Sequence, residues 1–343
     1  MDLERCYFDN IRGAAYIPVR TCNAYQQWKE YDHGVAVRDL GFAQRLHLNA
    51  VRIWLSYELW IEDREKMENG FEDFLSVASG QGIRVMPSLF ECCGREPSRE
   101  TMEDKDQFTA DAVRSPGTEI TKDRKRWKEP FAFLDWFLGK YGYDERVLAV
   151  EVTNEPKNVD DHVFAIALLK RAKSAATDLP VTLGCEHVCD NILYKEYIDI
   201  FQTHENMPNS SAELDHLLRR AKMVMEIERR PLWVTEWQQI REGSWGFEDP
   251  SKVTKEGMRP HHCTIAPILH KYGVGNFVWN LMLRPAYLAQ PRAVGTFNGL
   301  FHEDGSVYSL EDARAVADDP NLVLKENHTL PACFDRVAAM SEV

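Results

Sequence analysis

The sequence is organised around Arg146-Val147-Leu148-Ala149-Val150-Glu151-Val152-Thr153-Asn154-Glu155-Pro156. Residues 147–152 are almost all apolar, as in a strand that is covered on both faces. Pro156 ends the run, because proline has no backbone N–H to continue a ladder of hydrogen bonds. The stretch therefore predicts a buried strand whose end carries the carboxylate of Glu155.

A second short apolar run also leads into a glutamate. It reads Leu232-Trp233-Val234-Thr235-Glu236-Trp237. Parallel strands of a barrel have their carboxyl ends at one mouth. Glu155 and Glu236 are therefore candidates to meet there, with two carboxyl groups about 5 Å apart.

Short apolar runs alternate with polar loops and amphipathic helices along the chain. We predict eight strands, at residues 13–18, 50–55, 83–90, 147–152, 181–185, 198–204, 232–237 and 274–280. Such alternation is typical of a parallel sheet with helices outside it. Eight units in 343 residues fit an α/β protein with a (β/α)8 TIM barrel, formed as a single domain over residues 1–343.

Two features qualify this assignment. Pro87 lies inside the third predicted strand, where a proline weakens pairing. The polar stretch at residues 94–129 is long for a loop, so we interpret it as a flap over one mouth of the barrel or as a surface insertion. A doubly wound open sheet is the competing fold, but the sequence lacks the GxGxxG and GxxxxGK[ST] phosphate loops that usually accompany it.

Composition narrows the function classes. The net charge of −13 argues against nucleic-acid binding, and no apolar run is long enough for a membrane-spanning helix. The polar N-terminus does not resemble a signal peptide, and the eight cysteines show no metal-binding spacing. We therefore expect a cytoplasmic protein, or a secreted one if a leader has been removed. The oligomeric state stays open.

The predicted strand ends carry the candidate site residues. These are Tyr16, Arg52, Glu91, Asn154, Glu155, Glu186, His204, Glu236 and Trp279. The set has no convincing cluster of metal ligands, so we predict no metal and no cofactor. Two nearby carboxylates are sufficient for cleavage of a glycosidic bond, since one protonates the leaving oxygen and the other attacks.

The other side chains fit a sugar site. Arg52 can favour the ionised form of a nucleophile beside it. Trp279 offers a flat apolar face to a sugar ring, as do Trp54, Trp237 and Trp245 if they lie at the mouth. Glu151, deeper in its strand than Glu155, is predicted to be structural.

These motifs resemble clan A of the glycoside hydrolases and are most similar to family five, the cellulase family. The likeness extends from Arg52 on the second predicted strand to Trp279 on the eighth. It implies that Glu155 is the acid/base and Glu236 the nucleophile. It also implies that Asn154 holds the sugar 2-hydroxyl and that Arg52 hydrogen-bonds the nucleophile, with His204 matching the histidine of the sixth strand.

The chain departs from the family pattern at two positions. The family usually has a tyrosine two residues after the strand-six histidine, where this chain has Asn206. Family members also often have a histidine at the end of strand three, where this chain has Glu91. Both departures leave the sugar specificity open, and neither affects the pair of glutamates.

The sequence thus predicts a retaining hydrolase of β-linked oligosaccharides or small β-glycosides. Alternatives are a transglycosylase that uses the same site and a carbohydrate-binding barrel without catalysis. A barrel isomerase or lyase for phosphorylated sugars is disfavoured, because the loops after strands seven and eight are aromatic rather than glycine-rich. Tyr16, Glu91 and Trp237 are included as candidate substrate-binding residues with Arg52, Asn154, His204 and Trp279.

Overall fold

Eight parallel strands surround a common axis in the computed structural model, which describes residues 10–106, 108–175, 177–241, 256–287, 292 and 295–330. The strands pair in the order β5-β4-β3-β2-β1-β8-β7-β6. They are β1 Arg12–Ala15, β2 Ala50–Trp54, β3 Arg84–Ser88, β4 Val150–Asn154, β5 Val181–Gly184, β6 Phe201–Asn206, β7 Leu232–Gln238 and β8 Gly275–Val278. A short hairpin, β9 Arg284–Pro285 and β10 Phe297–Asn298, follows β8.

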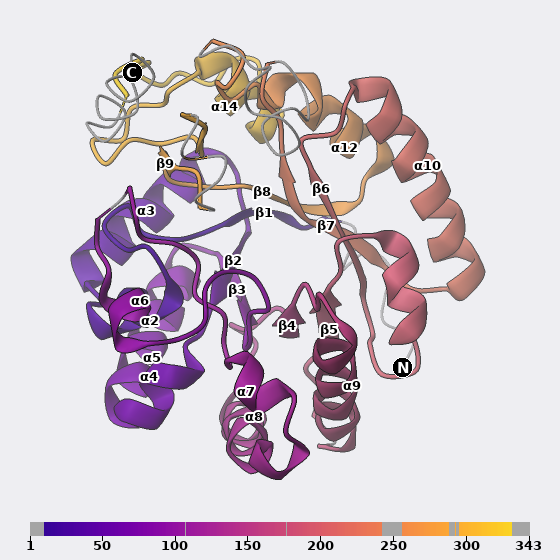
Figure 1. The fold of residues 1–343 in the computed structure, drawn as a ribbon. Helices are drawn as coiled ribbons and strands as arrows, with labels where there is room; N and C mark the ends of the chain where they lie inside the picture. Colours follow the sequence, from indigo (N-terminus) through magenta and orange to yellow (C-terminus); the bar gives the residue numbers. More distant parts are fainter. Residues whose placement is uncertain are drawn as a thin grey trace, which may run out of the picture.

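The first and last strands of this order are also joined. The backbone N–H of Asp199 donates to the carbonyl of Val181 over 2.7 Å, and the Thr182 hydroxyl donates to the carbonyl of Ile200 over 2.8 Å. These bonds connect β5 to the residues that enter β6. The sheet therefore closes into a nearly complete barrel, and the predicted (β/α)8 fold is confirmed (Figure 1).

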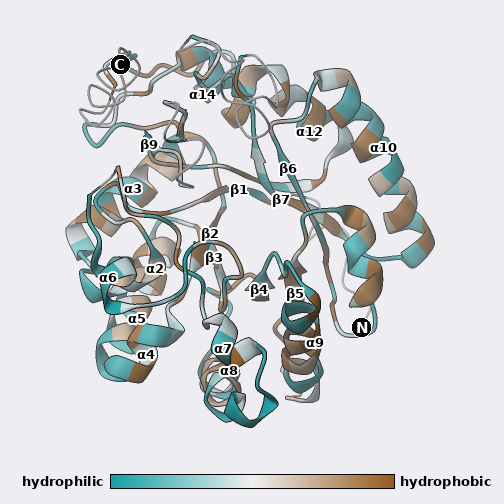
Figure 2. Cartoon of the chain, viewed as in Figure 1, coloured by the Kyte–Doolittle hydropathy of each residue, from teal (hydrophilic) through white to brown (hydrophobic). Residues whose placement is uncertain are grey.

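Helices surround the barrel on its outside (Figure 1). Their bounds are α2 Ala24–Lys29, α3 His33–Arg45, α4 Tyr57–Glu62, α5 Arg64–Gly80, α6 Arg99–Glu103, α7 Thr118–Thr121, α8 Lys128–Tyr141, α9 Val159–Ser174, α10 Ser211–Glu228, α12 Ala266–Tyr272 and α14 Leu310–Ala317. Short 3-10 turns are η1 Arg124–Arg126, η2 Val188–Leu193 and η4 His262–Thr264. Figure 2 shows that hydrophobic and hydrophilic residues share most of these helices, as expected when one face packs on a sheet.

Polar side chains set where the helices begin. Asp32 caps α3, Asp63 caps α5 and Ser210 caps α10, each by accepting a backbone N–H of the first turn. Asn158 caps α9 by accepting the backbone N–H groups of Asp160 and Asp161. Both acids lie in the first turn, where their charges interact favourably with the helix dipole.

Large side chains fill the barrel where glycines leave room for them. Trp233, Phe277 and Met86 belong to an apolar cluster that is separate from the larger one between strands and helices. A β-carbon at Gly13 would lie 2.3 Å from the Phe277 ring, and one at Gly275 would lie 2.3 Å from the Trp233 ring. The glycines of β1 and β8 therefore permit aromatic packing in the barrel, below the mouth that holds the candidate site.

The strand boundaries differ from the predicted ones where pairing is irregular. β4 begins only at Val150, because Val147 pairs with Val85 as an isolated bridge. Pro87 does lie within β3. The bonds from β3 to β4 run through Val85 and Leu89, so the missing N–H of Pro87 falls where that ladder is interrupted.

The polar segment 94–129 contains short helices and is not a structureless loop. Its backbone folds back on itself through bridges from Glu91 to Ser115 and from Arg95 to Val113. Arg114 is buried and forms an ion pair with Asp161 of α9. Among the described residues of this segment, Gly94 is the one that lines the large cavity at the mouth, so its interpretation as a flap stays a prediction.

In the part of the chain that the structure describes, no helix combines the length and apolarity needed to cross a bilayer. The described cysteines, Cys22, Cys92, Cys93, Cys185, Cys189 and Cys263, are free thiols.

Candidate active site

The mouth at the carboxyl ends of the strands opens into a cavity of about 970 Å³. It is lined by Glu91, Asn154, Glu155, Glu186, His204, Glu236 and Trp279 among the predicted site residues. Seven predicted residues from six strand ends therefore share one cavity. Its size is in the range of small-molecule sites.

Irregular pairing directs the two glutamates into this cavity. The register between β4 and β5 shifts between Glu151 and Asn154, and that between β7 and β8 shifts between Val234 and Trp237. A shift of one residue moves side chains to the opposite face of a sheet, and bulges often re-aim residues beside active sites. Both strands that carry the candidate glutamates have such a shift.

The backbone of Glu155 is itself unusual. Its φ of 42° lies in the left-handed region, which side chains other than glycine rarely adopt. Consecutive residues of a regular strand point to opposite faces, yet Asn154 and Glu155 both line the cavity. The turn at Glu155 allows this, and such strain is concentrated at functional sites.

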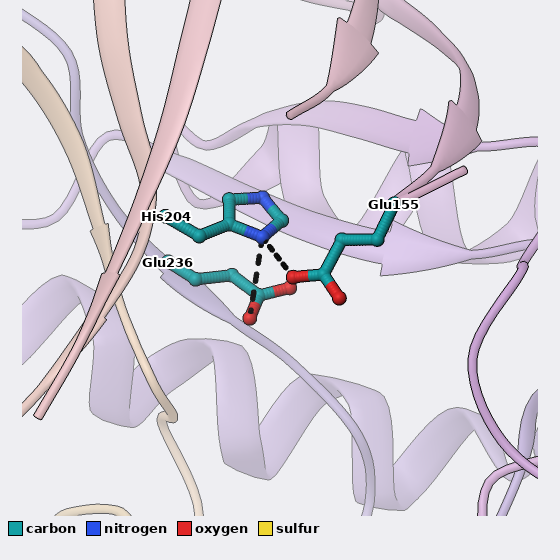
Figure 3. A group of neighbouring side chains, drawn as sticks. All are labelled: Glu155, His204 and Glu236. Atoms are coloured by element: carbon teal, nitrogen blue, oxygen red, sulfur yellow. Dashed lines mark hydrogen bonds and ion pairs between the residues drawn. The ribbon is translucent and has the colours of Figure 1, made fainter. Parts of the chain in front are cut away.

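The carboxylates of Glu155 and Glu236 point toward each other and toward His204 (Figure 3). One oxygen of each carboxylate and one ring nitrogen of His204 lie within 4.8 Å of one another. His204 Nδ1 is hydrogen-bonded to Glu155 Oε1 and lies 3.7 Å from Glu236 Oε2. The pair therefore has the short separation that the sequence predicts.

Charge balance around Glu155 favours its ionised form. Burial alone would raise its pKa, but His204 and Lys157 outweigh burial and hold the pKa below the ordinary value. Lys157 Nζ lies 2.7 Å from Glu155 Oε2 and 2.7 Å from Glu186 Oε1. Burial alone would lower the pKa of His204, but the charges of Glu236 and Glu155 outweigh burial and raise it. A proton between Glu155 and His204 is thus held on the histidine side.

Arg52 connects the two sides of the site from β2. Its Nε and Nη2 donate to Glu151 over 2.9 and 2.6 Å, and its Nη1 donates to Glu236 Oε1 over 2.6 Å. Nη2 also donates to Asn154 Oδ1 over 2.7 Å. The guanidinium is fully buried, so Glu151, which the sequence predicts to be structural, serves as its counter-ion, and Arg52 positions the other two residues.

Glu91 holds the opposite end of Asn154. The Asn154 Nδ2 donates to both Glu91 oxygens over 3.1 Å, and the backbone N–H of Cys93 donates to Glu91 Oε1 over 2.7 Å. The pKa of Glu91 is raised to about 7, mainly by burial and also by the charges of Glu155 and Glu236, against the hydrogen bonds from Cys93 and Asn154 that lower it. The carboxyl of Glu91, the third in the site, therefore titrates near neutral pH.

The second oxygen of Glu236 is held by Asn206, which the sequence marks only as a departure from the family pattern. Asn206 Nδ2 donates to Glu236 Oε2 over 2.9 Å. Asn206 stands two residues after His204, so it shares a strand face with a predicted site residue, which is the signal that could have identified it. Lys157 was also missed, although it follows Pro156 directly and thus lies near the strand end.

Aromatic side chains form part of the wall. Trp279 and Tyr287 line the cavity, with their ring centroids 5.7 Å apart. Trp54 contacts the Trp279 ring edge-on at 5.6 Å and lies over the Arg52 guanidinium, but it does not line the large cavity. Trp245 lies outside the described residues.

Two predicted substrate-binding residues face away from the cavity. Tyr16 stacks on Phe74 of α5, and its hydroxyl donates to Asp39 over 3.1 Å. Trp237 is buried and donates from Nε1 to Asn276 over 3.0 Å. Trp237 faces away because consecutive residues of a strand point to opposite faces, and Glu236 points into the cavity. Neither side chain is placed to contact a ligand in this cavity.

Glu155, His204 and Glu236 also have the spacing of metal ligands. Two fixed cations oppose that use, since Arg52 lies 2.6 Å from Glu236 and Lys157 lies 2.7 Å from Glu155. A divalent cation at this point would face both positive charges. The predicted metal-free site stays a prediction.

No protein-family model matches the sequence, and no curated protein matches it. Solved structures do resemble it. The exo-β-1,4-mannosidase Op5Man5 from Opitutaceae bacterium strain TAV5 has a TM-score of 0.62 and 14% identity, over 89% of this chain and 58% of that one. GH5_18 from Streptomyces cattleya, in complex with GlcNAc, has a TM-score of 0.61 and 15% identity, over 92% and 82%. The endo-β-1,4-mannanase from Thermotoga petrophila has 0.59 and 10%, over 90% and 75%.

This chain has the fold of these glycoside hydrolases. It spans only 58% of the length of the mannosidase from Opitutaceae. At these identities the likeness establishes the shared barrel, and the chemistry must be argued from the site.

Proposed function

We propose that the protein is a retaining β-glycoside hydrolase of the family-five type, with Glu236 as nucleophile and Glu155 as acid/base. The observation that carries the proposal is that one oxygen of Glu155 and one oxygen of Glu236 lie within 4.8 Å of each other at the mouth of the cavity. Retaining enzymes place these groups about 5–5.5 Å apart, and inverting enzymes place them farther apart to admit a water molecule. The shared fold of the structural neighbours supports the same conclusion.

In the first step Glu236 attacks the anomeric carbon, and the bond to the leaving oxygen breaks as Glu155 delivers a proton to it. Arg52 and Asn206 hold the two oxygens of Glu236 at 2.6 and 2.9 Å, which favours the ionised nucleophile. In the second step Glu155 removes a proton from water, which attacks the same carbon and releases Glu236.

Glu155 must carry a proton for the first step, although His204 and Lys157 lower its pKa. The hydrogen bond to His204 supplies one, because the pKa of His204 is raised and the two groups share a proton. A leaving group that enters beside Glu155 displaces the contact to Lys157, and the proton then moves onto the carboxyl. Glu155 and His204 act together in this account, with one proton between them.

β-Mannosides are the first substrates to test. Neighbours with this fold are described as an exo-β-1,4-mannosidase and an endo-β-1,4-mannanase, and a variant of GH5_18 from Streptomyces cattleya was crystallised in complex with Manβ1-4GlcNAc. The cavity has the aromatic wall that a pyranose ring requires, at Trp279 and Tyr287.

The test uses aryl β-mannosides and β-glucosides with the wild type and two variants. Glu236→Gln should lower kcat by roughly 10⁴-fold on every substrate, because no nucleophile remains. Glu155→Gln should lower it by about 10²–10⁴-fold on poor leaving groups and far less on dinitrophenolate, which departs without a proton. Proton NMR of the first-formed sugar should show the β-anomer.

Unchanged turnover in Glu236→Gln would rule the mechanism out. An added acceptor sugar tests the transglycosylase alternative, since transfer products would then exceed the hydrolysis product. Saturable oligosaccharide binding without turnover in the wild type would favour a carbohydrate-binding barrel instead.

A further inference from the structure

Three carboxamide side chains form a continuous chain of hydrogen bonds that ends at Glu236. Asn298 of β10 donates from Nδ2 to Gln238 Oε1. Gln238 of β7 donates from Nε2 to Asn206 Oδ1 over 2.9 Å, and Asn206 of β6 donates from Nδ2 to Glu236 Oε2 over 2.9 Å. All four residues line the cavity.

Chemistry fixes the direction of this chain. An ionised carboxylate only accepts hydrogen bonds, so Asn206 must present its NH₂ to Glu236 and its oxygen to Gln238. Gln238 must then present its NH₂ to Asn206 and its oxygen to Asn298. Each amide orientation is therefore set by the charge of Glu236 and supported by the next amide. Successive hydrogen bonds of this kind polarise one another.

Strand register assembles the chain. Asn206 and Gln238 are partners in the β6–β7 pairing, beyond the shift that also pairs His204 with Glu236. Gln238 and Asn298 are buried, with 4% of each residue exposed. Asn298 reaches them from the β9–β10 hairpin, which forms a separate two-stranded sheet outside the barrel sheet. The hairpin thus acquires a role at the site.

We propose that Asn206, Gln238 and Asn298 are positioning residues that orient Glu236 and favour its charge through this amide chain. The proposal rests on the nucleophile role proposed for Glu236. It assigns a function to the β9–β10 hairpin and to three residues that the glutamate pair does not explain.

Other charged groups face Glu236 from the remaining elements. Arg52 of β2 donates to Glu236 Oε1, and Nδ1 of His204 on β6 lies 3.7 Å from Glu236 Oε2. Glu155 lies across the cavity after β4, and Glu91 faces the same space after β3. The amide chain is the neutral contribution to this environment, so its effect must be separated from direct charge effects.

The discriminating variant is Asn298→Asp, which lies two amides away from Glu236. An ionised carboxylate at 298 accepts the NH₂ of Gln238, which reverses Gln238 and then Asn206. Glu236 would then face an amide oxygen. We expect kcat/KM at neutral pH to fall about tenfold to hundredfold, since a donor to a charged group is lost, with the acidic limb of the pH profile moved to higher pH. Asn298→Ala removes a donor without reversing the chain and should cost less than tenfold.

A double-mutant cycle separates transmission through the amides from direct charge repulsion. Gln238→Met interrupts the chain with a neutral side chain of similar size. If the amides transmit the effect, Asn298→Asp should shift the acidic limb in the wild-type background but not in the Gln238→Met background. Equal shifts in both backgrounds would show simple repulsion and overturn the proposal, as would no shift in either.

A measurement without turnover distinguishes this proposal from the proposed function. Glutamate labelled with ¹³C at the carboxyl gives a titration curve for Glu236, which is assigned by its disappearance in Glu236→Gln. Asn298→Asp should move that curve to higher pH, and Gln238→Met should abolish the movement. A glycosidase assay that fails beside the expected titrations would overturn the proposed function alone, and unchanged titration curves beside an active enzyme would overturn the amide chain alone.

Discussion

At the scale of single residues, the site depends on opposite demands on one carboxylate. In the proposed mechanism Glu155 must hold a proton to protonate a leaving group, yet His204 and Lys157 lower its pKa. Lys157 also bridges to Glu186, and 36% of its side chain is exposed. We infer that Lys157 sets the pH range over which Glu155 can act.

Replacement of Lys157 by Met tests this inference. The change removes a cation that stabilises the Glu155 carboxylate, so the pKa of Glu155 should rise. The acid form exists below that pKa, and the alkaline limb of kcat/KM should therefore move to higher pH, by about one unit. A pH profile on an aryl glycoside with a poor leaving group measures the limb.

Lys157→Arg is the matched control, because it retains the charge and should leave the limb nearly in place. An alkaline limb that is identical in Lys157→Met and the wild type would contradict the assignment.

At the scale of elements, the barrel places the site by local departures from regular pairing. The shifts in β4 and β7 turn Asn154, Glu155 and Glu236 toward the mouth. β5 accommodates this at Gly184, where an added β-carbon would lie 2.6 Å from Asn154 Oδ1 and 3.2 Å from Glu151 Oε1. The absence of a side chain at Gly184 therefore leaves room for Asn154 and Glu151 to accept hydrogen bonds from Arg52.

Gly184→Ala should lower activity more than stability. The methyl group forces Asn154 away from Arg52 and Glu91, and overpacking of this kind costs about 1–3 kcal/mol. We expect kcat/KM to fall at least about tenfold while the protein still unfolds cooperatively, since small displacements in a site have large effects on rate. Steady-state kinetics and urea unfolding measure the two effects.

Gly139→Ala in α8 is the control, because a β-carbon there meets nothing within 4 Å. It should stabilise the protein by about 0.5–1 kcal/mol and leave activity unchanged. Equal activity in Gly184→Ala and the wild type would show that Asn154 is not positioned by this contact.

At the scale of the whole molecule, buried acids make stability depend on pH. Burial raises the pKa of Glu91 from 4.5 to about 7, and burial raises the pKa of Glu58 to about 7 as well. The folded state then binds more protons than the unfolded chain between these values. Stability is greatest below the unfolded pKa and decreases as pH rises through the folded one. A net charge of −13 adds repulsion in the same direction.

Glu91→Gln tests this at one residue. The variant carries no titrating group, so it should be more stable than the wild type by roughly 2–4 kcal/mol above pH 7, with the difference vanishing near pH 4.5. Urea unfolding at pH 5 and pH 8 measures both stabilities.

Glu119→Gln removes the same charge from a side chain that is 85% exposed, and it should change stability little at either pH. A difference between Glu91→Gln and the wild type that is equal at both pH values would contradict the buried titration.

The sequence by itself determined the barrel and the places of Glu155 and Glu236 at the ends of two strands. Apolar runs alternating with amphipathic helices dictate a parallel sheet locally, and Asn154-Glu155-Pro156 marks a strand end by its own chemistry. The same pattern also identifies Arg52, His204 and Trp279 as candidate site residues, because they lie at predicted strand ends. Each of these inferences needs only neighbouring residues in the chain.

Only the tertiary structure decided which side chains meet. Tyr16 and Trp237 face away from the cavity, and Asn206, Lys157, Gln238 and Asn298 enter the site instead. Their placement depends on register shifts between strands and on a hairpin that returns from beyond β8. The physical reason is that one inserted residue reverses the faces of a strand, and pairing between distant segments has no local signature in the sequence.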